Sequence, residues 1–273
     1  MLQYEFFRHA LLTAVLASLM CGIIGTYIVA RRLVFISGGI THASFGGIGI
    51  AYFFGFNPVL GAAVFALLSA FGVELITKKS GVREDSAIGI FWSFGMAVGI
   101  IFIFLSSGYT PNLMSFLFGS ILTVSSNDLL MMALLSMAVT AFFVIFYNLI
   151  LYISFDEDYA LTKRVPVQLM NYILIGLVSL VIVLNIRVVG VILVISFLTL
   201  PQVTANMLSH HFRSIIVYSI LIALLGSVGG LFVSYYADLP SGPVIICIFV
   251  LFFLVVKLVN RIIRRWMIQK ALT

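Results

Sequence analysis

His42 is the side chain in this sequence that is best placed to carry chemistry, because it is ionisable and lies deep in an apolar run. It stands nine or ten residues from the start of that run, which puts it about 14 Å along a helix and near the middle of a bilayer. Ionisable groups at that depth mark functional sites by default, and imidazole is a ligand for zinc, copper, iron and nickel. His42 is therefore a candidate metal ligand on an ion path. The alternative is a structural histidine bonded to a neighbouring helix.

Four neutral polar side chains are candidates to line the same path: Thr41, Ser44, Gln202 and Asn206. They come from two unusual apolar runs, one with five glycines between Gly38 and Gly49 and one that contains Pro201. Glycine and proline inside a membrane helix indicate close packing, a kink or unwound backbone that lines a cavity. Because the two runs point in opposite directions, they suggest inverted repeats, with interrupted helices two and seven around a substrate path. Chance similarity is the alternative.

The rest of the sequence offers no recognisable catalytic constellation. It has no Gly-x-x-x-x-Gly-Lys-Ser/Thr loop for binding ATP phosphates, and no nucleophile with a neighbouring base stands out in the apolar runs. An intramembrane enzyme would need two or more ionisable residues at one depth, and only His42 is plainly deep. A secondary transporter driven by protons or sodium would need buried carboxylates, and Glu74 lies close to the end of its run. We therefore do not expect an enzyme, and an ion-coupled secondary transporter is an alternative.

Nine apolar runs must position these residues, and each is about long enough to span a bilayer as a helix of about 20 residues. Thirteen of the fifteen lysines and arginines lie in alternate gaps between the runs, and only Arg8 and Arg187 lie in the other gaps. By the positive-inside rule the cation-rich gaps are cytoplasmic, the N-terminus is outside and the C-terminus is inside. The runs are 10–30, 33–54, 58–76, 86–105, 129–153, 167–185, 188–208, 214–236 and 242–259.

The composition agrees with a chain that lies almost entirely in a membrane. Hydrophobic residues make up 63% of it and charged residues 9%, whereas charged residues make up about 25% of a globular protein. The net charge of +6 is spread over several gaps, so we expect contact with membrane lipid and no nucleic-acid partner. The predicted fold class is an all-α polytopic membrane protein of about nine transmembrane segments, with residues 1–273 as a single transmembrane domain.

Two longer gaps and one outer turn complete the organisation. Residues 113–124, in an outer gap, form an apolar stretch too short to span and are expected to be an interfacial or re-entrant helix. In an inner gap, acids precede bases, an order that suits the dipole of a short cytosolic helix. Asp238 opens an outer turn and either attracts cations at the outer mouth or serves the turn alone. The charged inner gap contains Asp156, Glu157, Asp158, Lys163 and Arg164, followed by Pro166.

Six short motifs occur in an order that resembles the permeases of the metal-ion class of ABC importers, which carry zinc, manganese or iron(II). The resemblance extends over nearly the whole chain, and each motif stands at a sensible position in the membrane topology. The motifs are Thr41-His42-Ala43 after Arg31-Arg32, EDSAIGI at 84–90, LMSFLFGS at 113–120, FDEDYA at 155–160, VGVILV at 189–194 and DLPSG at 238–242.

The resemblance implies the permease subunit of an ATP-driven importer in the bacterial inner (cytoplasmic) membrane. It implies a homodimer with the path at its two-fold axis, two cytosolic ATPase subunits and an extracytoplasmic metal-binding protein. The divalent metal ion is then the cargo, the chain itself binds no cofactor, and ATP hydrolysis belongs to the separate subunit. The resemblance also assigns ATPase coupling to the charged inner gap, namely to Asp156, Glu157, Asp158, Tyr159, Lys163, Arg164 and Pro166.

The seventh span departs from the family pattern, because Gln202 and Asn206 stand where smaller or basic residues are expected. The second span departs from it at one position. Members usually read Gly-Asp-x-x-Ser-His in the second span, and residues 37–42 here read SGGITH. Gly38 stands where the acid is expected, one helical turn before His42, so a hard oxygen ligand is missing. The departure favours zinc as the cargo, with manganese or iron as alternatives. A different transport class, an ABC permease for iron chelates or cobalamin, also stays open, although its members are normally longer, with ten spans and no required histidine.

Overall fold

Long apolar helices account for most of the computed structural model, which describes residues 4–106 and 124–271. Eight of these helices are long and apolar enough to cross a membrane, and no β-strand occurs within the described ranges. The all-α membrane fold predicted from the apolar runs is therefore confirmed. The eight helices are α1 (Glu5–Ala30), α2 (Val34–Phe54), α3 (Pro58–Ser80), α4 (Glu84–Leu105), α6 (Ser126–Ile145), α9 (Val167–Val189), α12 (Phe212–Ala237) and α13 (Ser241–Ala271).

The seventh apolar run forms two short helices, α10 (Val191–Phe197) and α11 (Leu200–Asn206), in place of one long helix. Pro201 stands in the first turn of α11, where its missing N–H and the clash of its ring with the carbonyl four residues earlier end a continuous helix. That carbonyl belongs to Phe197, and its oxygen accepts a hydrogen bond from Nε2 of Gln202 at 3.0 Å. The interruption predicted for this run is confirmed, and the pair accounts for the ninth predicted segment.

The second apolar run forms one uninterrupted helix, α2, so the prediction of an interruption there is wrong. Its glycines serve close packing instead. A Cβ on Gly47 would overlap the backbone of Gly61 in α3, and a Cβ on Gly95 in α4 would lie 2.5 Å from the carbonyl oxygen of Ala43 in α2. Glycine lets membrane helices approach closely while their own backbone hydrogen bonds stay intact.

The charged inner gap contains the predicted short helix. After α6 the chain forms α7 (Tyr147–Phe155) and then α8 (Glu157–Thr162). Asp156 begins α8, because its Oδ1 accepts a hydrogen bond from the backbone N–H of Tyr159 at 2.9 Å. An acid at a helix N-terminus satisfies a free N–H and complements the helix dipole. The interfacial helix expected at 113–124 falls outside the described residues, apart from Val124.

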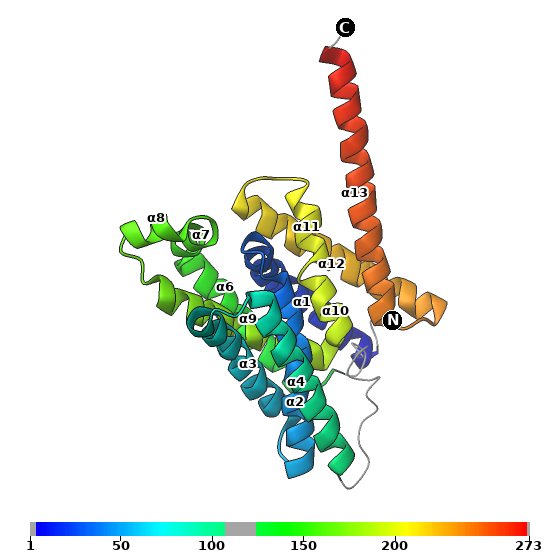
Figure 1. Ribbon diagram of the computed structural model, residues 1–273. Helices are drawn as coiled ribbons and strands as arrows, with labels where there is room; N and C mark the ends of the chain where they lie inside the picture. Colours follow the sequence, from blue (N-terminus) through cyan, green and yellow to red (C-terminus); the bar gives the residue numbers. More distant parts are fainter. Residues whose placement is uncertain (1–3, 107–123, 272–273) are drawn as a thin grey trace.

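The bundle has two chemically different ends. Figure 1 places α8, α11 and the C-terminus at one end, and the turn between α2 and α3 at the other. We call the first the basic end, defined by Arg31, Lys78 and Lys163, and the second the opposite end, defined by Asn57 and Arg187. Helix α13 is 31 residues long and projects beyond the other helices at the basic end (Figure 1).

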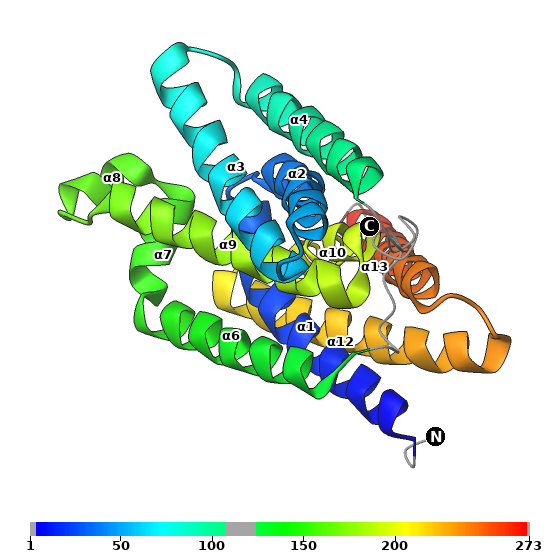
Figure 2. The same ribbon diagram turned by 90° about the horizontal axis from the view of Figure 1, so that it is seen from below.

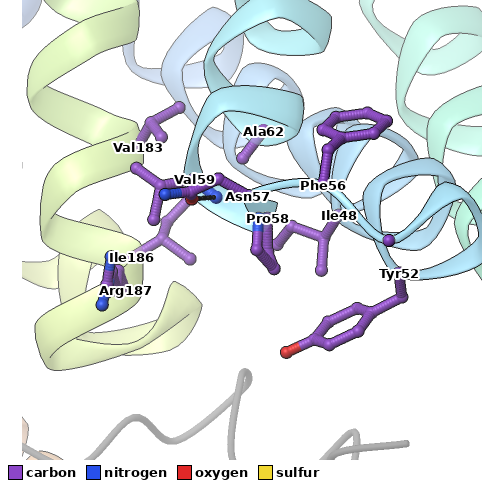
Figure 3. A pocket seen from close by; sticks show the side chains of 11 residues that line it. Ile48, Tyr52, Phe56, Asn57, Pro58, Val59, Ala62, Val183, Ile186 and Arg187 are labelled. Atoms are coloured by element: carbon purple, nitrogen blue, oxygen red, sulfur yellow. Dashed lines mark hydrogen bonds between the residues drawn. The ribbon is translucent and has the colours of Figure 1, made fainter.

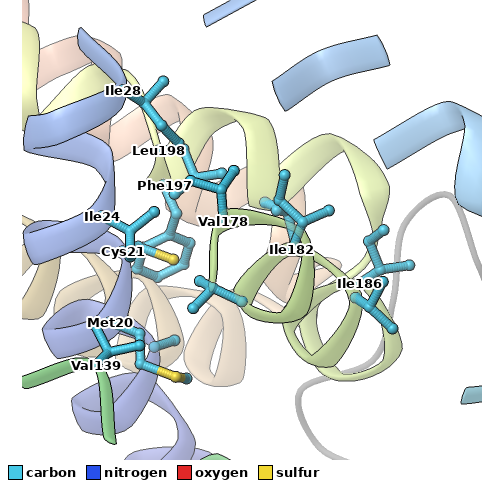
Figure 4. Packing of buried hydrophobic residues seen from close by; sticks show 14 of the residues in the cluster. Met20, Cys21, Ile24, Ile28, Val139, Val178, Ile182, Ile186, Phe197 and Leu198 are labelled. Carbon is cyan, nitrogen blue, oxygen red and sulfur yellow. The ribbon is translucent and has the colours of Figure 1, made fainter. Parts of the chain in front are cut away.

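Helix α1 lies at the centre of the buried core. In Figure 4 its side chains, such as those of Ile24 and Ile28, lie next to residues of α9 and α10. Figure 2 shows α9 and α10 between the group α2–α3–α4 on one side and α1, α6 and α12 on the other. At the far side of α10, Phe197 packs edge-on against Phe249 of α13, with ring centroids 5.1 Å apart. Helix α2 lies between α4 and the central helices α9 and α10 (Figure 2).

Candidate ion path

His42 presents a partly exposed imidazole from the middle of α2. Its ring stacks on the indole of Trp92 in α4, with centroids 4.2 Å apart and planes inclined by 4°. No residue in the described ranges forms a hydrogen bond with either ring nitrogen, so the bonded structural alternative is not found there. The stack orients the ring, and within the described residues neither nitrogen is occupied by a hydrogen bond.

Gly38 lies one turn before His42 on the same side of α2. A Cβ built on Gly38 would meet no atom within 4 Å outside its own stretch of helix. No other side chain has therefore taken the space in which the family pattern places an acid. Among the described residues, a Cβ can therefore be added at Gly38 without a clash, one turn before His42.

Thr41 and Ser44 flank His42 in sequence, but their side chains are buried in the helix packing. The hydroxyl of Thr41 donates to the carbonyl of Ser37 at 2.6 Å, and that of Ser44 donates to the carbonyl of Thr41 at 2.7 Å. Both protons are used by the backbone of α2 itself. Each hydroxyl oxygen keeps a lone pair, so the two residues can still accept a hydrogen bond or contact a cation.

Gln202 lies in a different part of the bundle from His42. Its side chain is fully buried, and Nε2 donates to the carbonyl of Cys21 in α1 at 2.7 Å as well as to that of Phe197. The amide therefore joins α11 to α1 and supports the break between α10 and α11. Asn206 is exposed at the end of α11. Thr41 and Ser44 thus share α2 with His42 but are buried where its imidazole is partly exposed, and the two amides lie on α11.

The residues expected to couple to an ATPase divide into two groups. Glu157 is directed into the bundle, where its Oε1 accepts from Arg31 of α1 at 2.5 Å and from Asn171 of α9 at 3.1 Å. Burial opposes its charged form, but these two partners outweigh burial and hold the pKa of Glu157 below its usual value. The other six are exposed on the surface of the basic end: Asp156, Asp158, Tyr159, Lys163, Arg164 and Pro166.

Asp238 ends α12 in a left-handed conformation, with φ of 52°. Its backbone N–H donates to the carbonyl of Ser234, and the hydroxyl of Ser234 donates to the carbonyl of Leu239 at 2.6 Å. Aspartate tolerates this conformation better than most residues. The carboxylate is exposed and has no ion-pair partner in the described part of the chain. A turn function is observed, and a function at the outer mouth stays a prediction.

A cavity of about 630 Å³ at the opposite end was not predicted from the sequence (Figure 3). Its wall includes Tyr52 from α2, the turn at Asn57 and the side chain of Arg187 from α9. Nε of Arg187 pairs with Oδ1 of Asp128 at 3.0 Å, and Oδ2 of Asp128 accepts from the hydroxyl of Ser125 at the start of α6. The sequence carried one hint of this cavity: Arg187 and Asp128 are a cation and an acid in the outer gaps, where charged residues are rare.

Trp92 is the other functional candidate that sequence reasoning missed. It lies in the fourth apolar run, and nothing in its spacing relates it to His42, which is fifty residues earlier. The contact depends on the close approach of α2 and α4, which in turn depends on glycines in both helices. A tryptophan inside an apolar run was the only local signal.

The described residues form a bundle of apolar helices long enough to span a membrane, the architecture of a polytopic membrane protein. The comparison with protein families agrees: residues 3–260 match the model of the ABC 3 transport family, and the chain therefore belongs to that family. Subunits of this class form the membrane part of ABC transporters and are not catalytic, because a separate subunit hydrolyses ATP.

Relatives and a solved structure cover nearly the whole chain. An uncharacterized membrane protein of Synechocystis is 40% identical over 247 residues, which are 90% of this chain and 88% of the relative. The manganese transport system membrane protein MntC of Listeria monocytogenes is 33% identical over 255 residues, 93% of this chain and 91% of its own. The structure of PsaBC from Streptococcus pneumoniae in complex with Fab superimposes with a TM-score of 0.84 at 32% identity, covering 93% of this chain and 91% of that chain.

Proposed function

We propose that this chain is the permease subunit of an ATP-driven importer for divalent transition-metal ions. Membership of the ABC 3 transport family supports the transporter class, and the name of the Listeria relative supports a metal cargo. The observation that carries the proposal is the imidazole of His42, which is partly exposed, stacked on Trp92 and without a hydrogen-bond partner among the described residues. A neutral imidazole in that state is a ligand for a transition metal.

Zinc is the favoured cargo because of the ligands that α2 offers. Imidazole nitrogen suits zinc, whereas manganese is better matched by carboxylates, and Gly38 supplies no carboxylate beside His42. Manganese is the second candidate, because a relative that shares 33% of its residues is named for manganese transport.

Weak and transient contact at His42 suits a conduit. Ions must bind well enough to enter a path and loosely enough to leave it. One histidine nitrogen, with water and the hydroxyl oxygens of Thr41 and Ser44 nearby in the sequence, is a weaker ligand set than the three or four protein ligands of a resident zinc site. Within the described residues no group of three or more histidine, cysteine or acidic side chains is arranged to hold a metal ion.

The partners and the orientation belong to the same proposal. The basic end faces the cytoplasm of a bacterial cell by the positive-inside rule, so the N-terminus is outside and the C-terminus inside. The exposed side chains of α8 and of its flanking residues then contact a cytosolic ATPase, and the opposite end receives metal from an external binding protein. A second copy of the chain completes the path at a two-fold axis.

The test is metal uptake by the complete complex in proteoliposomes, with its own ATPase subunit and external binding protein. ATP-dependent uptake of Zn²⁺ should be measured alone and with competing Mn²⁺ and Fe²⁺, and iron chelates and cobalamin should be tested in parallel. We expect uptake of free divalent metal, with Zn²⁺ the most effective. Uptake of a chelate or of cobalamin without uptake of any free ion would contradict the proposal, and preference for Mn²⁺ would correct the cargo alone.

A further inference from the structure

Arg31 joins three helices at the basic end of the bundle. It ends α1, its Nη1 donates to the carbonyl of Ile153 in α7 at 2.9 Å, and its Nη2 donates to Glu157 in α8 at 2.5 Å. The side chain is 24% exposed and that of Glu157 is 40% exposed. A planar guanidinium that binds two acceptors in fixed directions is a rigid connector rather than a loose surface contact.

The acids of α8 differ in what they contact. Glu157 is bound by Arg31 and by Asn171 of α9, whereas Asp158, the next residue, is exposed and has no ion-pair partner among the described residues. Asp156 caps α8. Glu157 therefore ties α8 to α1 and α9 through bonds that Asp158 lacks, although 40% of its side chain is exposed.

The connection reaches the helix that carries His42. Only Arg32 and Leu33 separate Arg31 from the start of α2 at Val34, and Arg32 has a positive φ of 59°. A non-glycine residue in this region is strained and persists only where its surroundings hold it. A shift of Arg31 must therefore move the first turn of α2 or change this tight turn.

The surroundings allow Arg31 to shift. A cavity of about 210 Å³ lies beside it and is also lined by Glu157, Asn171 and Glu74 of α3. Several buried polar atoms of this wall have no hydrogen-bond partner, among them Nε of Arg31 and Oε2 of Glu74. Glu74 accepts from Lys78 through Oε1 at 2.6 Å and keeps Oε2 free, so a free donor of Arg31 and a free carboxylate oxygen lie on the wall of the same cavity. Two alternative arrangements of a few charged groups are the kind of element that transmits a conformational change.

We propose that the Arg31–Glu157 pair transmits movement of α8 to the α1–α2 turn and so to the helix that bears His42. In this role Arg31 and Glu157 are positioning residues, and they do not contact the ATPase or the metal. The inference rests on the proposed function of α8 as the contact with a cytosolic ATPase. In this inference the exposed residues of the charged inner gap bind the ATPase, and Glu157 relays the movement of α8 to Arg31.

The test compares Glu157→Gln with Glu5→Gln in the complete transporter. Glutamine keeps the shape of glutamate and removes its charge, and Glu5→Gln is the matched control, because Glu5 is 74% exposed in the first turn of α1 and lies outside the proposed ATPase contact. The quantity to measure is metal ions transported per ATP hydrolysed in proteoliposomes, together with co-purification of the ATPase and thermal stability of the complex. Mutations along such a connection change coupling by about 0.5–2 kcal/mol, so we expect the ratio to fall about two- to thirtyfold in Glu157→Gln while Glu5→Gln keeps the parent ratio.

Two further variants distinguish relay from simple stabilisation. Arg31→Gln should lower the ratio as Glu157→Gln does, and the double variant should be no worse than either single one, because the two residues act as a unit. Asn171→Ala, which leaves the ion pair in place, gives a milder loss and serves if Glu157→Gln does not assemble. Additive losses in the double variant, or a parent-like ratio in a well-assembled Glu157→Gln or Asn171→Ala complex, would overturn the inference.

A crosslinking control separates this inference from the proposed function of α8. A cysteine introduced by Asp158→Cys should crosslink to the ATPase subunit in the assembled complex. If it does crosslink and Glu157→Gln still transports with the parent ratio, the relay is wrong and the contact stands. If no crosslink forms from α8 in an active complex, the proposed function of α8 is wrong and the relay falls with it.

Discussion

Replacement of Gly95 by alanine should separate α4 from α2 and destabilise the bundle. The new Cβ would lie 2.5 Å from the carbonyl oxygen of Ala43 and 2.6 Å from its Cα, both in the backbone of α2. Ordinary van der Waals contact begins at 3.4 Å, so the two helices must move apart by about 0.9 Å. Because the obstacle is backbone, no side-chain rotation can relieve it.

Forced expansion of a packed core costs about 1–3 kcal/mol, and alanine regains about 0.5–1 kcal/mol over glycine inside a helix. Gly89→Ala is the matched control, because Gly89 is in the same helix and a Cβ there would meet nothing within 4 Å. Gly89→Ala gains the helix stability of alanine over glycine without the clash. The free energy of unfolding of Gly95→Ala should therefore fall about 1–3 kcal/mol below that of Gly89→Ala.

The assay is equilibrium unfolding of the purified protein in detergent or lipid, with the parent, Gly95→Ala and Gly89→Ala measured side by side. The stack of His42 on Trp92 gives a second readout, since tryptophan emission should change when α4 moves away from α2 and should not change in the control. Equal stability and equal emission for the two variants would refute the packing of α2 against α4 described above.

Three other variants test separate parts of the structure. Gln202→Leu should cost about 1–3 kcal/mol of unfolding free energy, because the carbonyl of Phe197 loses its partner at the break before α11; parent-like stability would mean that the amide does not support the break. Gly38→Asp should fit the open space beside His42 and shift competitive uptake toward Mn²⁺, because carboxylate suits manganese; an unchanged ratio of zinc to manganese uptake would argue against a path there. In a background without native cysteines, Ser80→Cys and Ser241→Cys should react with an impermeant thiol reagent from opposite sides of the membrane. Labelling of both from one side would contradict the proposed orientation.

Much of the fold could be predicted from the sequence because membrane helices are constrained by length and polarity. Apolar runs of about 20 residues define the spans, and Pro201 predicts the break between α10 and α11 through its missing N–H. The glycines of α2 could not be interpreted in the same way. They allow either an unwound helix or close packing, and the outcome depends on the backbones of α3 and α4, which lie far from α2 in sequence.

The site was predicted less completely than the fold. The depth of His42 follows from counting residues along its run, but its stack on Trp92 follows from the packing of α2 on α4. Gln202 looked like a path residue because it is polar and next to proline, yet its partner is Cys21, 181 positions away. The inward direction of Glu157 likewise depends on Arg31, 126 positions away. Side-chain direction and distant partners are not encoded in local spacing.

The most direct test of the account is metal uptake by His42→Ala in the complete transporter. His210→Ala is the matched control, because His210 is exposed at the basic end, beyond α11. Loss of residues that support a metal ligand already costs about 10–100-fold, so we expect removal of the ligand itself to lower ATP-dependent Zn²⁺ uptake at least about tenfold. Assembly with the ATPase and basal ATP hydrolysis should stay near the parent values, and His210→Ala should transport normally. Uptake by His42→Ala equal to that of the parent would contradict the account and leave His42 with a structural role.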